Sequence, residues 1–252
     1  MESIFSHTVS NGKIWKIFPL PDKTQVLLEV REAAERKVSF TVVDYVQDKI
    51  LWNNVLLEEP WWVTLYTCRN QVLEFIHYLD AENPGQKVVV GIDLNTKKKL
   101  WVREFEKIEK GNSVGFATQK DYLGEQERHF RSEGKKKEGS PEIFRMSNPF
   151  HYQENTPEFK TVARFIQLKK NVVAVGNIEY LEKNGLIFVG YYYYNEGCLI
   201  NNLLVLLENG KELTSRILGE DLKGFGSDTF FLVEDYLFFV KNKTTFEVLF
   251  IA

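Results

Sequence analysis

The sequence contains one pattern twice, and this repeat constrains the fold more than any other feature of the chain. Residues 43–52 read VDYVQDKILW, and residues 92–101, which lie 49 positions later, read IDLNTKKKLW. Each copy has an apolar segment, a polar turn and a second segment that ends in tryptophan, which is typical of an antiparallel β-hairpin. A period of about 40 to 50 residues built from such hairpins predicts repeated four-stranded sheets, as in the blades of a β-propeller. The shift aligns four identical pairs: Asp44 with Asp93, Lys49 with Lys98, Leu51 with Leu100 and Trp52 with Trp101.

Short apolar segments separated by turn residues continue along most of the chain, which predicts an all-β protein. Aromatic residues make up 14% of the sequence, and aromatic side chains favour the pleated surface of a sheet. No window combines a sustained helical apolar period with a helix cap, so we expect strands almost throughout. The expected strands are residues 14–19, 25–31, 37–45, 49–53, 61–67, 71–79, 87–94, 98–105, 113–118, 143–146, 161–168, 172–180, 186–194, 202–207, 229–234, 236–241 and 245–251.

The ends of the hairpins divide the chain into five units, which predicts a small propeller with about five four-stranded blades in a single domain, residues 1–252. An open or four-unit arrangement is the alternative, because an irregular insertion at about residues 119–160 interrupts the pattern. The last unit has three clear strands, so we expect the N-terminal segment, residues 3–9, to pair with it and close the ring. The unit ends lie near Trp52, Trp101, Met146, Leu213 and Ile251.

The repeated hairpin resembles that of quinoprotein-type (PQQ-repeat) β-propellers, and the chain looks like an uncharacterised bacterial relative of them. The resemblance covers residues 14–101, and Lys97 stands where that family prefers glycine. In the family the tryptophan packs between adjacent blades. The resemblance therefore implies structural roles, with similar burial of both tryptophans, for the repeated residues Asp44, Trp52, Asp93 and Trp101.

The resemblance does not carry over an enzyme. Quinone-dependent dehydrogenases of this type have eight blades, an acidic cluster for calcium and cofactor, and often a vicinal disulfide. Here Cys68 and Cys198 are far apart, and no His, Cys or acidic residues have the spacing of a metal site. We therefore expect no cofactor and no metal.

The composition disfavours other classes of protein. A net charge of −3 and two short lysine runs do not resemble the basic face of a nucleic-acid-binding protein. No apolar stretch reaches the ~18 residues of a membrane-spanning helix. The first residues lack the basic start and apolar core of a secretory signal. We therefore expect a cytoplasmic monomer that contacts neither nucleic acid nor membrane.

Six residues are candidates for ligand binding, each with packing as the alternative. A tryptophan pair at the start of one strand, a run of four tyrosines at the end of another and a histidine in an unusual loop could all line the rim of a propeller, where binding residues concentrate. These candidates are Trp61, Trp62, His151, Tyr152, Tyr192 and Tyr194.

No nucleophile elbow, phosphate loop or zinc signature is present, so no catalytic residue is assigned. The pattern favours a non-catalytic propeller that binds a protein partner or small ligand at one mouth of the ring. A glycan-binding or glycan-cleaving propeller is the alternative, and cleavage would require convergence of two carboxylates from a set such as Asp80, Glu154 and Glu179.

Overall fold

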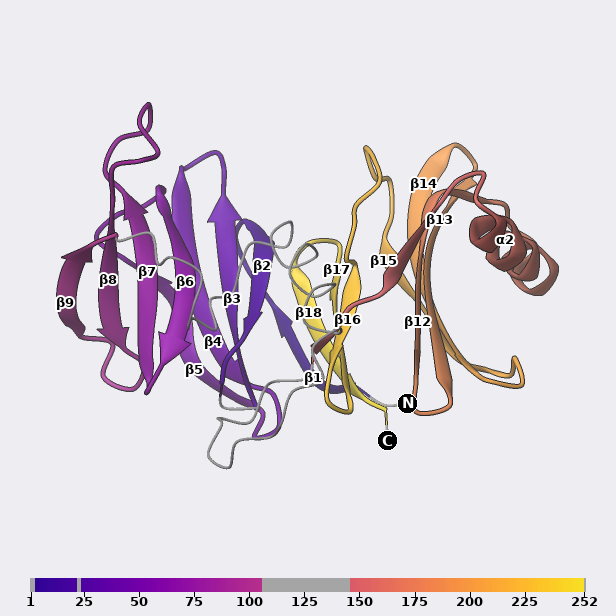
Figure 1. Ribbon diagram of the computed structural model, residues 1–252, viewed down its shortest axis with the longest axis horizontal. Coiled ribbons are helices and arrows are strands. Elements are labelled where there is room, and N and C mark those ends of the chain that lie inside the picture. The colour runs from indigo at the N-terminus through magenta and orange to yellow at the C-terminus, as the bar shows by residue number, and fades with distance from the viewer. Residues whose placement is uncertain (1–2, 22–23, 106–145, 252) are drawn as a thin grey trace, which may run out of the picture. The chain divides into compact units, whose positions relative to one another are not determined.

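The structure, a computed structural model, describes residues 3–21, 24–105 and 146–251. These residues form four antiparallel sheets and one helix (Figure 1), which confirms the all-β class. Contacts divide the chain into two compact units. Unit A is residues 15–143, and unit B combines residues 1–14 with residues 144–252. Whether the chain forms the single domain expected from the sequence stays a prediction.

The described residues of unit A form two four-stranded sheets whose strands follow one another in chain order. This is the order that the repeat predicts, and the two copies of the hairpin are the last two strands of each sheet. The first sheet contains β2 (Lys13–Pro19, whose first two residues fall in unit B), β3 (Gln25–Glu32), β4 (Lys37–Asp44) and β5 (Lys49–Leu56). The second contains β6 (Val63–Arg69), β7 (Val72–Tyr78), β8 (Lys87–Asp93) and β9 (Lys99–Glu104).

The repeated aspartates form the turns of the two hairpins. Asp44 Oδ1 accepts hydrogen bonds from the backbone N–H groups of the second and third residues after it, at 3.2 and 2.9 Å. Asp93 Oδ1 does the same at 3.1 and 2.6 Å, and also accepts the Thr96 hydroxyl. These hydrogen bonds from Thr96 lower the pKa of Asp93. The aligned residues Asp48 and Lys97 have φ of 50° and 63°, which explains why glycine is preferred at this position in the family that the hairpin resembles.

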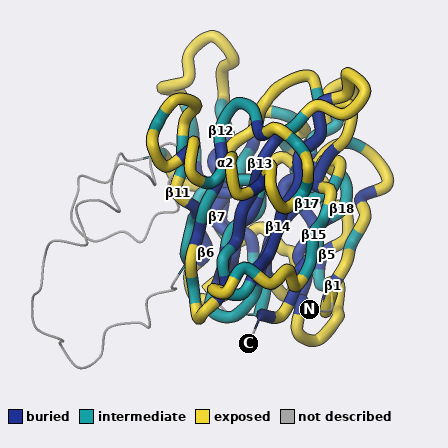
Figure 2. Tube along the Cα trace, turned by 90° about the vertical axis from the view of Figure 1, so that its right-hand side faces the viewer, coloured by how far each residue is buried: buried dark blue, intermediate teal, exposed yellow. Residues whose placement is uncertain are grey.

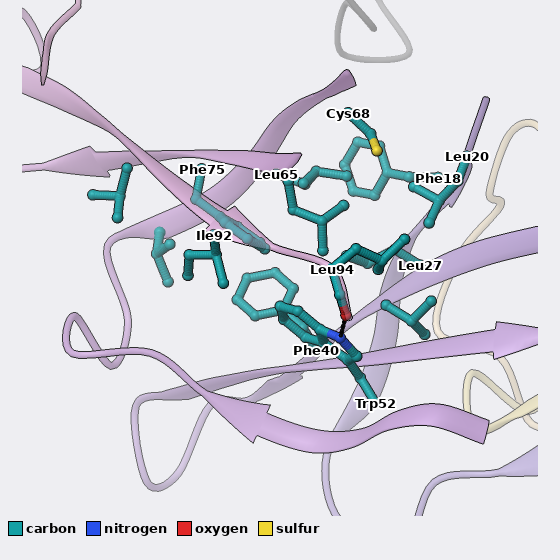
Figure 3. Close-up of a cluster of buried hydrophobic side chains, with 14 of the residues drawn as sticks. Phe18, Leu20, Leu27, Phe40, Trp52, Leu65, Cys68, Phe75, Ile92 and Leu94 are labelled. Atoms are coloured by element: carbon teal, nitrogen blue, oxygen red, sulfur yellow. Dashed lines mark hydrogen bonds between the residues drawn. The ribbon is translucent and has the colours of Figure 1, made fainter. Parts of the chain in front are cut away.

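The two tryptophans of the repeat differ in burial. Trp52 is fully buried, and its indole Nε1 donates to the carbonyl oxygen of Leu94, 2.6 Å away, in the turn of the second sheet (Figure 3). Its ring also stacks with Phe75 of that sheet. Trp101 is half-buried and lies flat on Gly91, where a Cβ would overlap its ring. The similar burial expected from the repeat is therefore wrong, and residues 106–145, which follow β9 in the chain, lie outside the described residues.

Unit B contains two five-stranded sheets. The last sheet has the order β1-β18-β17-β16-β10, and β1 pairs antiparallel with β18. The expected pairing of the N-terminal segment with the last unit is therefore confirmed. The strands of this sheet are β1 (Ser3–Thr8), β10 (Met146–Ser147), β16 (Phe230–Val233), β17 (Tyr236–Lys241) and β18 (Thr245–Phe250). The other sheet follows chain order, with β11 (Phe150–Gln153), β12 (Ala174–Lys183), β13 (Leu186–Asn195), β14 (Cys198–Leu207) and β15 (Glu212–Gly219).

The hairpin end expected near Met146 does not close a unit of its own. Met146 lies in β10, which pairs with β16 at the edge of the last sheet. The expected strand 113–118 and most of the expected insertion, residues 119–145, lie outside the described residues. The rest of the insertion, residues 146–160, is regular: it contains β10, β11 and the start of a helix.

Helix α2 (Pro157–Lys170) corrects the strand expected at residues 161–168. Thr156 caps its first turn by accepting the N–H of Phe159, Pro157 occupies the first turn, and Asn171 ends the helix in the left-handed conformation. The apolar side chains that α2 turns toward the sheet recur three, four and seven residues apart, which is the helical period. They are Phe159, Val162, Ala163 and Ile166.

Alternation along the strands gives the β11–β15 sheet two covered faces. One face packs against α2 (Figure 1), with Ile178, Val189 and Leu204 in the contact. The opposite face packs against the last sheet, where Phe188 meets Phe230. Buried residues therefore follow the strands, and exposed residues gather in the turns (Figure 2).

Candidate functional site

Trp61 and Trp62 lie in unit A, in a bend that precedes β6, and not on a strand as expected. The Glu59 carboxylate accepts the backbone N–H groups of both residues, at 2.9 and 2.8 Å, and so fixes this bend. Trp61 is half-buried, whereas Trp62 is 46% exposed. The two neighbouring indoles therefore have different environments, and a capped bend rather than strand alternation separates them.

Trp61 belongs to a surface that the sequence did not indicate. The guanidinium of Arg31, on β3, lies 5.2 Å from the centre of the Trp61 ring and 5.9 Å from that of Trp15, on β2. Trp15 is 64% exposed. We refer to Trp15, Arg31 and Trp61 as the arginine–tryptophan surface. Guanidinium groups attract the faces of aromatic rings at such distances, so the two indoles and the cation are held as a group.

A buried carboxylate fixes the arginine of this surface. Arg31 Nε donates to Glu29 Oε1 at 2.8 Å, and one terminal nitrogen donates to the carbonyl oxygen of Val63 at 3.0 Å. Glu29 is fully buried, and its other oxygen accepts the hydroxyl of Thr64, on β6, at 2.6 Å. Strands β3 and β6 belong to different sheets, so the packing of the two sheets of unit A determines where Arg31 points.

In unit B, His151 lies between two carboxylates. It occupies edge strand β11 directly opposite Glu179 of β12. Its Nε2 lies 2.9 Å from Asp228 Oδ1, and its Nδ1 lies 3.9 Å from Glu179 Oε1. The hydrogen bond with Asp228 raises the pKa of His151 although partial burial opposes this. The imidazole therefore holds a proton more tightly than an exposed histidine does.

Glu179 joins this histidine to the start of the last sheet. Its side chain is 1% exposed, and one oxygen accepts both the N–H of Thr229, at 3.0 Å, and the Thr229 hydroxyl, at 2.5 Å. Burial raises the pKa of Glu179. The two other candidate carboxylates do not join it: Asp80 caps an exposed turn in unit A, and Glu154 accepts the N–H of Gly176.

The tyrosine candidates are in different environments. Tyr192 is buried, and its hydroxyl accepts the N–H of Gly226 at 2.8 Å, while burial raises the pKa of Tyr192 to about 12. Tyr194 is 59% exposed. Tyr152 stacks with Tyr180 on the face of β11 opposite to His151. Of the candidates in unit B, only His151 and Tyr192 therefore share a face and contact the same segment, residues 226–229.

Sequence reasoning missed Trp15, Arg31 and Asp228. An exposed tryptophan, an arginine on a strand and an aspartate in a loop carry no motif, and their roles arise from contacts between separate strands. Among the described residues, no group of three His, Cys, Asp or Glu side chains could hold a metal ion. Within the same residues, no helix is long and apolar enough to cross a membrane.

Residues 21–101 match the model of a family described as a domain of unknown function (DUF4905). The match covers less than half of the chain and lies within unit A. It includes both copies of the repeated hairpin, Arg31 and Trp61, but not Trp15. No curated protein matches the chain.

Proposed function

We propose that this protein is a non-catalytic binding protein that recognises a protein partner through the arginine–tryptophan surface. One observation carries the proposal: Arg31 is fixed between two indoles, and one of them, Trp15, is 64% exposed. Tryptophan and arginine are the residues most enriched among those that dominate protein–protein binding energy.

The fixed position of Arg31 supports this proposal further. A long side chain that is free in solution loses entropy when a partner binds it. In the free protein, Arg31 is already held by its hydrogen bonds to Glu29 and Val63 and by the neighbouring rings. Most of its side-chain entropy is therefore lost before a partner binds. A partner would therefore meet a preorganised surface of two aromatic rings and a cation.

The proposal includes the architecture expected from the sequence, a quinoprotein-type propeller of about five blades closed by the N-terminal strand. Three observations support it: the turns of the two Asp-to-Trp hairpins, the chain order of the strands in three of the four described sheets, and the pairing of β1 with β18. An experimental structure tests it directly, since a propeller requires all sheets to surround one axis. An open row of sheets would overturn this part of the proposal.

The binding test compares three variants of the whole protein. Partners retained by the wild type are identified by quantitative affinity purification, and the best one is purified for calorimetry. We expect Trp15→Ala and Arg31→Lys each to weaken binding about 30-fold or more, as for residues that dominate an interface. Arg31→Lys keeps the charge but loses the planar group that contacts both rings.

Leu56→Ala is the matched control, because Leu56 is 55% exposed and lies on β5, at the opposite edge of the sheet from β2. This variant should bind as the wild type does. If all three variants retain the same partners with the same affinity, the arginine–tryptophan surface is not the binding site.

A glycan is the alternative ligand, and the exposed ring of Trp15 favours it, because a sugar can stack on an accessible indole. A glycan array probed with wild type and Trp15→Ala distinguishes the two ligands. Binding above background that disappears in the variant would favour the glycan over the protein partner. Binding at background level would remove the glycan alternative.

A further inference from the structure

His151 occupies a position where two carboxylates favour its protonated form. Its two ring nitrogens face different carboxylates, Asp228 through Nε2 and Glu179 through Nδ1. A neutral imidazole carries one N–H, whereas an imidazolium carries two. The Asp228 side chain is 8% exposed and that of Glu179 is 1% exposed. Water therefore has little access to either carboxylate.

The two carboxylates come from parts of unit B that this histidine connects. Glu179 belongs to β12, whereas Asp228 lies in the segment that leads into β16 of the other sheet. The same segment is attached at two more points, where Gly226 donates to the Tyr192 hydroxyl and Thr229 donates to Glu179. Residues 226–229 therefore contact the β11–β15 sheet through hydrogen bonds at three of their residues, Gly226, Asp228 and Thr229. Of the groups that donate these hydrogen bonds, the His151 ring is the one that titrates.

The remaining charged groups near this cluster do not replace the imidazolium. Asp228 and Glu179 are the charged groups that act on His151 among the described residues. Asp221 and Lys223, in the segment before Asp228, are exposed and pair with each other. On the opposite face of β11 and β12, Glu158 and Glu182 act on Tyr152 and add negative charge, not positive.

We infer that proton uptake by His151 fastens residues 226–229 to strands β11 and β12, so that this part of unit B is a pH-sensitive latch. In acid, the imidazolium donates to Asp228, and its positive charge, 3.9 Å from Glu179, neutralises one of the two negative charges. When the proton leaves, no positive charge remains between the two buried carboxylates, and their mutual repulsion loosens the segment.

The direction of the pH effect follows from the pKa shifts. The pKa of His151 is raised in the folded protein, so its stabilising effect is complete below the ordinary pKa of histidine, about 6.5, and is lost as pH rises through the raised value. The pKa of Glu179 is also raised, so the loss of its proton likewise destabilises the folded protein as pH rises. The latch therefore weakens with rising pH.

Hydrogen–deuterium exchange of the peptide that contains Gly226 and Thr229 tests this inference. We expect its protection, corrected for the intrinsic effect of pH, to fall about ten-fold or more between about pH 5.5 and about pH 8.5, a range that spans the titration. The variant His151→Gln should show lower protection and a much smaller pH dependence, because only Glu179 then titrates. Asp228→Asn should reduce the pH dependence, because it removes one of the two negative charges that favour the imidazolium.

His77→Gln is the control, because it makes the same substitution at a buried strand histidine on β7 of unit A. It should leave the exchange of this peptide unchanged. Protection in the wild type that is independent of pH would overturn the inference. So would a pH dependence as large in His151→Gln as in the wild type, since it would then belong to Glu179 alone.

Discussion

At the scale of single residues, the two tryptophans of the repeat show that sequence equivalence does not fix burial. Trp52 and Trp101 occupy equivalent positions in the two hairpins, and the aspartates of both hairpins bond their turns in the same way. Yet only Trp52 has the next described sheet over its ring and a buried acceptor for its indole N–H. Local structure follows from the local sequence, whereas burial depends on what packs beyond the sheet.

We therefore predict unequal costs for the two truncations. Trp52→Ala should lower the free energy of unfolding by about 3–5 kcal/mol, because it removes a fully buried ring and leaves the carbonyl of Leu94 without its donor. Trp101→Ala should cost about half of this or less, because its ring is half-buried. Urea midpoints at constant slope measure both costs. Equal values would show that Trp101 is covered as fully as Trp52.

At the scale of elements, helix α2 is the segment that sequence reasoning misread. Its interior contains Thr161, Val162, Phe165 and Ile166, which are β-branched or aromatic and favour strands in isolation. Its ends carry the opposite signal, with Thr156 before the first turn, Pro157 within it and two lysines before Asn171. Packing of one apolar stripe on the sheet outweighs the propensity of the interior residues.

The cap gives a prediction for this element. Thr156→Ala should destabilise the folded protein by about 1 kcal/mol, because the N–H of Phe159 loses its acceptor at the start of the helix. Hydrogen exchange of the first turn of α2 measures the effect locally. Thr161→Ala is the control: its hydroxyl bonds only a carbonyl within the helix, so the loss should be near zero. Equal changes in both variants would argue against a capping role.

The elements also explain how much of the candidate sites could be predicted. Period-two alternation and turn residues were sufficient to place nearly all strands of unit A, because neighbouring strands in each sheet are neighbours in the chain. Arg31 and Asp228 could not be found in this way. Their partners, Trp61 and His151, lie 30 and 77 positions away, and only the packing of separate strands brings them together.

At the scale of the whole molecule, the pairing of β1 with β18 joins the two ends of the chain. Phe5 is 4% exposed and contacts Phe246 of β18, with ring centres 6.2 Å apart. Val9 donates its N–H to the carbonyl of Thr244 at 3.0 Å, which extends the contact beyond the strand. The N-terminal strand thus covers the edge of the last sheet that would otherwise be open.

Deleting residues 1–9 should lower the melting temperature and cause association, because β18 would expose unpaired N–H and C=O groups to other chains. Phe5→Ala should lower the free energy of unfolding by about 3–5 kcal/mol while keeping the strand. Ile4→Ala, on the same strand but 37% exposed, should have a much smaller effect. Circular dichroism measures the melting of each variant, and size-exclusion chromatography with light scattering measures its association state. A truncated protein that stays monomeric with unchanged melting would show that β1 adds nothing to the last sheet, and the proposed closure of a ring by this strand would then fail with it.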